Sequence, residues 1–229
     1  RAEDVAWAVA RAFYIAKSGR PGPVVLDFTK NAQTEMVDFE PMTLDFIRSY
    51  DPDPTIDEEK VKEAAELIDK AERPFVLVGQ GVELGNAQEE LRTFLEKANI
   101  PCGCTLLGLS AIPTAHPLNK GMLGMHGNLA PNIKTNECDV LIAVGMRFDD
   151  RVTGNLATYA KQAKIIHLDI DPSEFNKNVK VDIPVLGDCK KTLTKLIGYI
   201  KENKHTEWIG SFAEHAQTEY ARVIEKEVY

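Results

Sequence analysis

Hydrophobic positions along the chain alternate between two spacings, and the two spacings predict helices and strands in turn. Apolar residues three and four positions apart, the helical spacing, cover residues 57–71, 86–98 and 129–136. Short unbroken apolar runs, typical of strands buried on both faces, follow these stretches. We expect strands at 74–78, 101–105, 139–144, 164–169 and 183–186, a weaker one around 122–123, and a last helix from 189 to about 202. This alternation predicts an α/β fold, with helices on both faces of a doubly wound, mostly parallel sheet of about six strands.

The first 56 residues have a different pattern. Residues 3–18 have helical spacing, and the apolar run 24–28 predicts a buried strand after a turn rich in glycine and proline. Residues 31–56 show no period and contain three prolines and several acids, which predicts a linker between domains. Since the chain begins with Arg1 rather than Met, we expect it to be a piece of a longer protein.

The last 26 residues, 204–229, predict a charged helix with one apolar stripe. Such a helix would either pack back on the sheet or reach toward a further domain. The pattern still runs at the final residue, so this end is also expected to be a boundary within a longer chain. The stripe consists of Trp208, Phe212, Ala216, Tyr220 and Ile224.

Charge and cysteine content exclude some classes of function. A net charge of −8 and a pI near 5.2 argue against nucleic-acid binding, because 35 acidic side chains outnumber 27 basic ones and leave no net positive charge to neutralise phosphates. No apolar run approaches the roughly 20 residues that a membrane span needs. Cys102, Cys104, Cys138 and Cys189 lack the spacing of a disulfide framework or a zinc site, so we expect reduced structural thiols in a cytoplasmic or organelle-matrix protein.

Polar groups and glycines follow each predicted strand. In a parallel sheet the carboxyl ends of the strands share one edge, where ligands bind to the loops. The two glycines of Gly79-Gln80-Gly81 allow either a close approach to a ligand or a tight turn, and the full dinucleotide fingerprint is absent. His126 stands alone in the glycine-dense stretch 121–127, and a lone histidine is more often packed in a core than a ligand.

Charged side chains at three further strand ends point to a nucleotide. The run Gly145-Met-Arg-Phe-Asp-Asp-Arg-Val-Thr-Gly154 brings arginines that could bind phosphate or stack on a ring. Asp169 has the position of an acid that binds ribose, while Asp171 and Asp188 could cap the helices that follow them. Together these groups predict a site for a nucleotide-type cofactor, and they leave NAD, FAD and ADP open.

Several of these stretches together resemble one family. The segments that begin at Thr105 (Thr-Leu-Leu-Gly-Leu-Ser-Ala-Ile-Pro), Gly121 (Gly-Met-Leu-Gly-Met-His-Gly) and Gly145 are similar to the acetolactate synthase (acetohydroxyacid synthase) large subunits. The stretch 18–24, with Asp27 and Lys30, resembles the end of that family's first domain. Ser110 and the run 128–131 depart from the family pattern, although Pro131 suits a first helical turn.

The resemblance implies a domain order and a cofactor. Residues 1–30 would be the last helix and strand of a thiamine-pyrimidine domain, 31–56 a linker, 57–203 a Rossmann-like central domain for FAD, and 204–229 a connection to a third domain. Thiamine diphosphate and Mg²⁺ would be bound by the other domains, with no metal site in this chain. The implied FAD residues are Arg20, Gly79, Gln80, Gly81, Thr105, Leu106, Leu123, Gly124, Met125, His126, Gly145, Met146, Arg147, Asp149, Asp169, Ile170, Gly187 and Asp188. The implied substrate-channel residues are Lys30, Met125, Asp150 and Arg151.

For the longer protein the resemblance implies decarboxylation of pyruvate on thiamine diphosphate. The hydroxyethyl unit would then join pyruvate or 2-oxobutanoate, a step toward valine and isoleucine, the branched-chain amino acids. FAD would be structural, and the chain by itself would be inactive. The implied partners are further copies of the large subunit and a small regulatory subunit. The alternatives are another thiamine enzyme of the oxalyl-CoA decarboxylase or pyruvate oxidase type, a nucleotide-dependent oxidoreductase or sirtuin-like deacylase, or a non-catalytic binding module.

Overall fold

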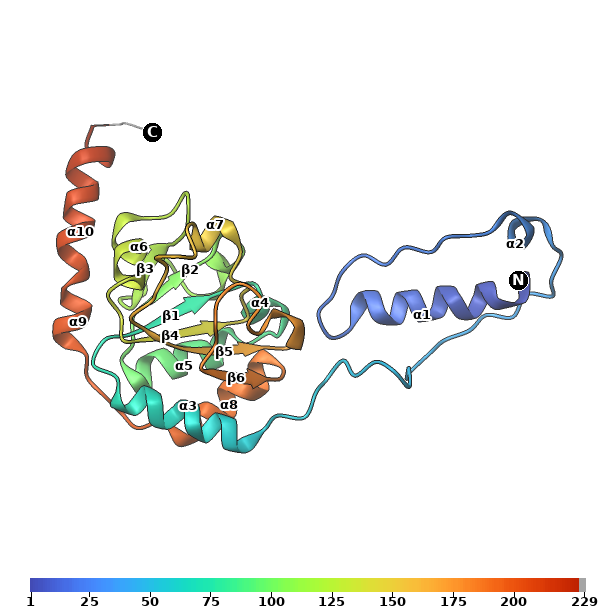
Figure 1. The fold of residues 1–229 in the computed structure, drawn as a ribbon, viewed down its shortest axis with the longest axis horizontal. Coiled ribbons are helices and arrows are strands. Elements are labelled where there is room, and N and C mark those ends of the chain that lie inside the picture. The colour runs from blue at the N-terminus through green and yellow to red at the C-terminus, as the bar shows by residue number, and fades with distance from the viewer. Residues whose placement is uncertain (227–229) are drawn as a thin grey trace. The chain divides into compact units, whose positions relative to one another are not determined.

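The computed structural model describes residues 1–226 (Figure 1). The chain divides into two compact units, Arg1–Pro54 and Thr55–Tyr229. The second unit contains one six-stranded sheet in the order β3-β2-β1-β4-β5-β6, and every neighbouring pair is parallel. This confirms the predicted doubly wound α/β fold. The strands are β1 (Pro74–Val78), β2 (Cys102–Cys104), β3 (Asn119–Met122), β4 (Val140–Val144), β5 (Lys164–Asp169) and β6 (Ile183–Leu186).

The predicted helices are present with small changes at their ends. α5 begins at Gln88 rather than 86, since Asn86 has a φ of 48° and cannot continue a right-handed helix. The weak strand expected around 122–123 is β3, which lies earlier in the chain and pairs with β2 at one edge. The helices of this part are α3 (Glu58–Lys70), α4 (Gly81–Leu84), α5 (Gln88–Ala98), α6 (Leu129–Thr135), α7 (Asp150–Thr153) and α8 (Cys189–Tyr199), with 3-10 turns η2 (Leu106–Ala111) and η3 (Pro172–Glu174).

Both faces of the sheet are buried, which explains the unbroken apolar runs. In β1, Val76 and Val78 belong to one core, which α3, α5 and α8 cover. Phe75 and Leu77 belong to a second core on the other face. Since successive side chains of a strand point to opposite faces, a strand between two layers has no polar side to present to water.

The charged tail packs back on the second core over its first half. It forms α9 (Thr206–Gly210), α10 (Phe212–Glu219) and a π-helical turn η4 (Tyr220–Ile224). The Trp208 Nε1–H donates to the Pro74 carbonyl at 2.8 Å, and Phe212 lies 5.5 Å from the Phe75 ring. Tyr220 and Ile224 are exposed, so the stripe continues beyond the part that the sheet buries. Residues 227–229 of the predicted helix lie outside the described residues.

The Arg1–Pro54 unit contains η1 (Ala2–Asp4), α1 (Val5–Lys17) and α2 (Lys30–Thr34). The predicted strand at 24–28 is wrong: this stretch forms no strand within the described residues. A strand is defined by hydrogen bonds to a neighbour, and within residues 1–226 the run 24–28 pairs with none. The stretch 31–56 is irregular as predicted, apart from α2 and one bridge between Ile47 and Tyr50.

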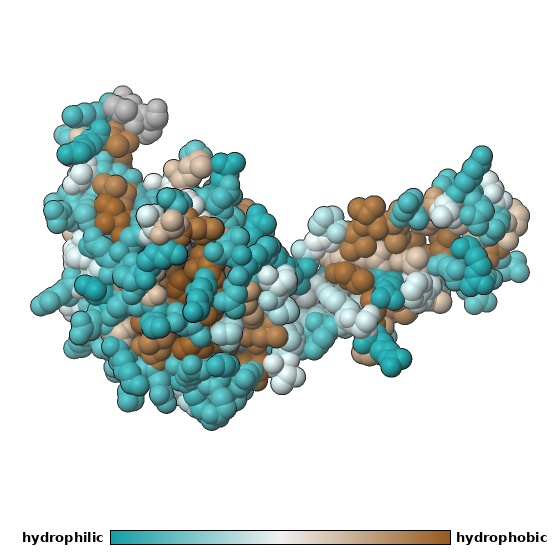
Figure 2. All heavy atoms as spheres, in the orientation of Figure 1, coloured by the Kyte–Doolittle hydropathy of each residue, from teal (hydrophilic) through white to brown (hydrophobic). Residues whose placement is uncertain are grey.

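This first unit exposes apolar side chains that a helix normally buries. α1 has no buried residue, and Phe13 is 69% and Met36 97% exposed. Figure 2 shows apolar surface gathered on this part of the chain. A helix needs a packed apolar face for most of its stability. The observation fits the prediction that residues 1–30 come from another domain, which stays a prediction.

All four cysteines are free and buried, as expected for structural thiols. Burial raises the pKa of the Cys138 thiol to about 12, and it also raises the pKa of Cys189. Because the thiolate is the reactive form, we expect neither of these thiols to react with a disulfide reagent in the native protein. In denaturant both thiols are expected to react completely. The reaction is measured by the absorbance of the thiolate that the reagent releases. Fast modification of Cys138 before unfolding would contradict this.

Candidate nucleotide site at the carboxyl edge of the sheet

The strand order changes direction between β1 and β4, the position where parallel α/β sheets bind ligands. β1 leads into residues 79–81 and β4 into residues 145–149. The two loops lie side by side, because the Gly81 N–H donates to the Gly145 carbonyl at 2.8 Å. The largest groups of predicted site residues therefore meet at one place on the carboxyl edge.

The glycines of these loops serve contact between backbones. A Cβ on Gly79 would lie 2.2 Å from the Gly145 oxygen and 2.3 Å from the Met146 Cβ. A Cβ on Gly145 would lie 2.6 Å from the Gly81 Cα, and Gly145 has a φ of +57°. These glycines thus allow the loops after β1 and β4 to pack backbone against backbone, and the neighbouring loop fills the space that each Cβ would take.

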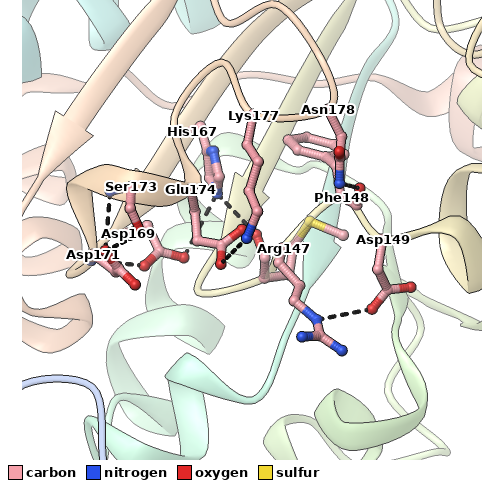
Figure 3. Close-up of polar contacts among 11 residues, drawn as sticks. Arg147, Phe148, Asp149, His167, Asp169, Asp171, Ser173, Glu174, Lys177 and Asn178 are labelled. Atoms are coloured by element: carbon pink, nitrogen blue, oxygen red, sulfur yellow. Dashed lines mark hydrogen bonds and ion pairs between the residues drawn. The ribbon is translucent and has the colours of Figure 1, made fainter.

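The loop after β4 presents Arg147 outward between two buried residues. Met146 and Phe148 are buried in the second core, whereas the Arg147 side chain is 59% exposed. Figure 3 shows the Arg147 guanidinium extending beside Asp149, and its Nε lies 3.1 Å from the Asp149 Oδ2. The Asp149 side chain also accepts from the Arg151 N–H, and this hydrogen bond caps the start of α7. Arg147 is thus a cation held at the rim.

The loops after β2 and β3 add apolar surface to this edge. Thr105 and Leu123 are buried, while Leu106 is 69% and Met125 61% exposed. The Met125 N–H donates to the Arg151 carbonyl, so the predicted channel residues Met125, Asp150 and Arg151 lie next to one another.

His126 is exposed in this loop, and the expectation of a packed core histidine is wrong for it. The reason is the backbone around it. Gly124 has a φ of +98°, and a Cβ there would meet the Arg151 carbonyl at 2.6 Å. The loop contacts α7 through its backbone, which leaves the side chains of Met125 and His126 on the outside.

The carboxyl ends of β5 and β6 carry the remaining acids. The Asp169 side chain is 10% exposed, and its Oδ1 accepts from the Asp171 N–H at 2.9 Å. Asp188 caps α8 through the Lys191 N–H, as predicted. Asp171 caps only the 3-10 turn η3, where a full helix was expected. Ile170 is half-buried beside Asp169, and Gly187 donates to the Asp169 carbonyl.

Arg20 and Lys30 belong to the Arg1–Pro54 unit. Their predicted roles in cofactor binding and in the substrate channel stay predictions. The other proposed site residues all belong to the second unit and follow its strands.

Two residues that sequence reasoning missed support the rim from behind. His167 of β5 is completely buried, and Asn178 follows η3. Both contact the backbone of the loop after β4. A signal for His167 was present, since one histidine interrupts the apolar run 165–168 two residues before Asp169. Nothing in the sequence near Asn178 indicates its partner.

The donors and acceptors at this edge suit a nucleotide. A guanidinium can bind a phosphate, the exposed Leu106 and Met125 can cover a flat ring, and a carboxylate such as Asp169 can accept from a sugar hydroxyl. These groups come from the ends of different strands, β2, β3, β4 and β5. The side chains present therefore fit an extended ligand such as FAD.

A comparison with known protein families assigns the sheet-containing part of the chain to one family. The family model described as the central domain of thiamine pyrophosphate enzymes matches residues 61–196, which is more than half of the chain. The matched range contains all six strands and both loops of the strand-order switch. The chain belongs to the thiamine pyrophosphate enzyme family, through its central domain.

Within that family the chain is similar to acetolactate synthase large subunits. It is 46% identical over 199 residues to a probable acetolactate synthase large subunit of Methanocaldococcus jannaschii, an alignment covering 85% of this chain and 34% of the relative. The large subunit of Corynebacterium glutamicum is 41% identical over 96% of this chain and 35% of its own length. The isozyme 2 large subunit of Escherichia coli K12 is 43% identical over 85% of this chain and 35% of its own length. The chain thus spans about a third of the length of these relatives.

The family assignment narrows the alternatives raised by the sequence. A sirtuin-like deacylase or a separate dinucleotide oxidoreductase is not favoured, because the matched family is that of thiamine pyrophosphate enzymes. The three relatives described above are named for acetolactate synthase, and none for oxalyl-CoA decarboxylase or pyruvate oxidase. Within residues 1–226, no helix has the length and apolar character needed to cross a membrane.

Proposed function

We propose that this chain is the central part of an acetolactate synthase large subunit and binds FAD along the carboxyl edge of its sheet. The observation that carries the proposal is the strand-order switch between β1 and β4, where Arg147 projects from a loop packed on residues 79–81. The names of the relatives support the activity of the longer protein.

In this proposal each group at the edge has a limited task. Arg147 binds a phosphate, Asp169 accepts from a sugar hydroxyl, and the apolar side chains of Leu106 and Met125 exclude water from the ring. FAD supplies a structural element rather than a redox step. The proposed FAD contacts are residues 79–81, 105–106, 123–126, 145–147, 149, 169–170 and 187–188. The resemblance adds Arg20.

The proposed reaction of the longer protein is the condensation of two 2-oxo acids. Thiamine diphosphate with Mg²⁺, bound by other domains, supplies the decarboxylation chemistry. Met125, Asp150 and Arg151 of this chain, with Lys30, are proposed to line the mouth of the substrate channel, where cations attract the carboxylates of 2-oxo acids. Large subunits would assemble with one another and with a small regulatory subunit, in the cytoplasm or an organelle matrix.

Arg147→Gln tests the FAD site. The chain is titrated with FAD, and binding is followed by flavin fluorescence. We expect the chain to bind FAD more tightly than ADP or NAD. The variant is expected to bind FAD about tenfold more weakly or worse, since a charge-assisted hydrogen bond contributes about 1.5–3 kcal/mol.

Arg73→Gln is the matched control, because Arg73 precedes β1 at the opposite edge of the sheet. This variant should bind FAD like the unmodified chain. A preference for NAD, or equal affinities of the two arginine variants for FAD, would contradict the proposed site.

A further inference from the structure

Two side chains outside the predicted site hold the backbone that carries Arg147. The His167 Nε2 lies 2.8 Å from the Met146 carbonyl oxygen, and the Asn178 Nδ2 lies 2.7 Å from the Phe148 carbonyl oxygen (Figure 3). A carbonyl oxygen can only accept, so both nitrogens donate. For His167 this contact requires the proton on Nε2.

Every carbonyl from residue 145 to residue 148 has a donor. The Gly145 oxygen accepts from Gly81, and the Arg147 oxygen accepts from the Asp149 N–H at 3.0 Å. The two side-chain donors supply the remaining partners, at residues 146 and 148. Surface loops normally leave such groups to water. Here the protein itself sets the direction of each peptide.

Packing alone does not account for a histidine at position 167. The ring is fully buried, with Phe148 and Phe175 each at 5.2 Å between ring centres. Its Nδ1 is buried and makes no hydrogen bond within the described part of the chain, residues 1–226. A buried polar atom without a partner is unfavourable, and phenylalanine would fill this apolar space without it. What histidine adds is Nε2, which donates to the Met146 carbonyl at 2.8 Å and also lies 3.6 Å from the Asp169 Oδ2.

The consequence is a fixed place for Arg147. With Met146 and Phe148 buried on either side, the Arg147 side chain has to point outward. Its Nε contacts Asp149, while the two terminal nitrogens form no hydrogen bond or ion pair within residues 1–226. A guanidinium whose backbone is already fixed loses less freedom when it binds an anion.

We propose that His167 and Asn178 are positioning residues, which hold the 145–148 backbone so that Arg147 faces a phosphate of the bound nucleotide. This rests on the proposed FAD site for its ligand, and on the observed carbonyl contacts for its mechanism. Neither side chain is assigned a contact with the ligand.

A pair of substitutions at His167 separates hydrogen bonding from packing. His167→Phe keeps a flat ring between Phe148 and Phe175 but removes the donor. His167→Gln loses the ring but retains an amide N–H at about the reach of Nε2. We expect His167→Phe to weaken FAD binding about tenfold, equal to about 1.4 kcal/mol, and His167→Gln to bind within about threefold of the unmodified chain.

Trypsin cleavage after Arg147 gives a second readout that needs no flavin. The loss of one carbonyl donor should expose the 147–148 peptide bond more often, so cleavage at this bond, measured by mass spectrometry, is expected to accelerate in His167→Phe and in Asn178→Ala. Asn178 is exposed, so its variant should fold even if a substitution at the buried position does not. In His167→Gln the rate should stay near that of the unmodified chain.

The outcomes distinguish the two proposals. Faster cleavage in His167→Phe and Asn178→Ala, without FAD binding by any form, would support the positioning and overturn the FAD site. Unchanged cleavage in both variants would overturn the positioning. If His167→Gln bound FAD more weakly and were cleaved faster than His167→Phe, position 167 would act by packing. This result would also overturn the positioning proposal.

Discussion

Gly79→Ala is expected to destabilise the Thr55–Tyr229 unit by about 3 kcal/mol. It is also expected to abolish FAD binding at the concentrations at which the unmodified chain binds FAD. The added Cβ would lie 2.2 Å from the Gly145 oxygen and 2.6 Å from the Met146 Cα, and both of these atoms belong to a backbone. Overpacking a core costs about 1–3 kcal/mol, and relief here requires the β1 and β4 loops to separate. Urea unfolding followed by far-UV circular dichroism measures the loss.

Gly198→Ala is the matched control for this substitution. Gly198 lies near the end of α8, and a Cβ there would meet nothing within 4 Å. Since alanine is favoured over glycine inside a helix by about 0.5–1 kcal/mol, this variant should be as stable as the unmodified chain or slightly more stable. If Gly79→Ala were equally stable, the contact between the two loops would not constrain the edge.

Trp208→Ala is expected to cost about 3–5 kcal/mol, the usual range for removing a buried tryptophan. The side chain is 6% exposed, and its N–H binds the first residue of β1. Phe212 contacts it edge to face at 5.2 Å, and the Lys134 Nζ lies 5.2 Å from its ring centre. The substitution therefore loosens both the start of β1 and the attachment of the tail.

Trp7→Ala provides the comparison, since Trp7 is 44% exposed and belongs to the Arg1–Pro54 unit. Unfolding of the sheet by urea, followed by far-UV circular dichroism, should be nearly unchanged in this variant. Because Trp208 contacts the amino end of β1, far from the loops at its carboxyl end, the folded Trp208→Ala protein should keep its affinity for FAD. Equal midpoints for the two tryptophan variants would contradict a structural role for the tail.

Much of the sheet could be predicted because its strands follow a local rule. A strand buried on both faces reads as a continuous apolar run, as in Val140–Val144, and the helices between strands show their own period. The same rule failed at 24–28, where the apolar run forms no strand within the described residues. An apolar run shows that a segment can be buried, whereas strand pairing depends on a neighbour that the run does not name.

At the candidate site the residue types could be predicted, but their orientations could not. Arg147 and Asp169 stand at strand ends in the sequence, so the meeting of their loops at one edge follows from a parallel sheet. A lone histidine is more often packed in a core, yet His126 is exposed, and its implied FAD contact stays a prediction; His167 drew no attention and is fully buried. Whether a histidine points inward depends on the packing of the loops around it, and that packing involves residues distant in the chain.

The sequence by itself determined the alternation of helices and strands, the class of sheet, the reduced cysteines and the strand ends that carry charge. These features follow from the spacing of side chains along a backbone of constant geometry. Only the tertiary structure decided which loops touch, as Gly79 touches Gly145, and which side chains support others, as His167 and Asn178 support the backbone of Arg147. Such contacts join residues that are 21 to 66 positions apart, and their geometry exists only once the parallel strands have paired and brought their carboxyl ends to one edge.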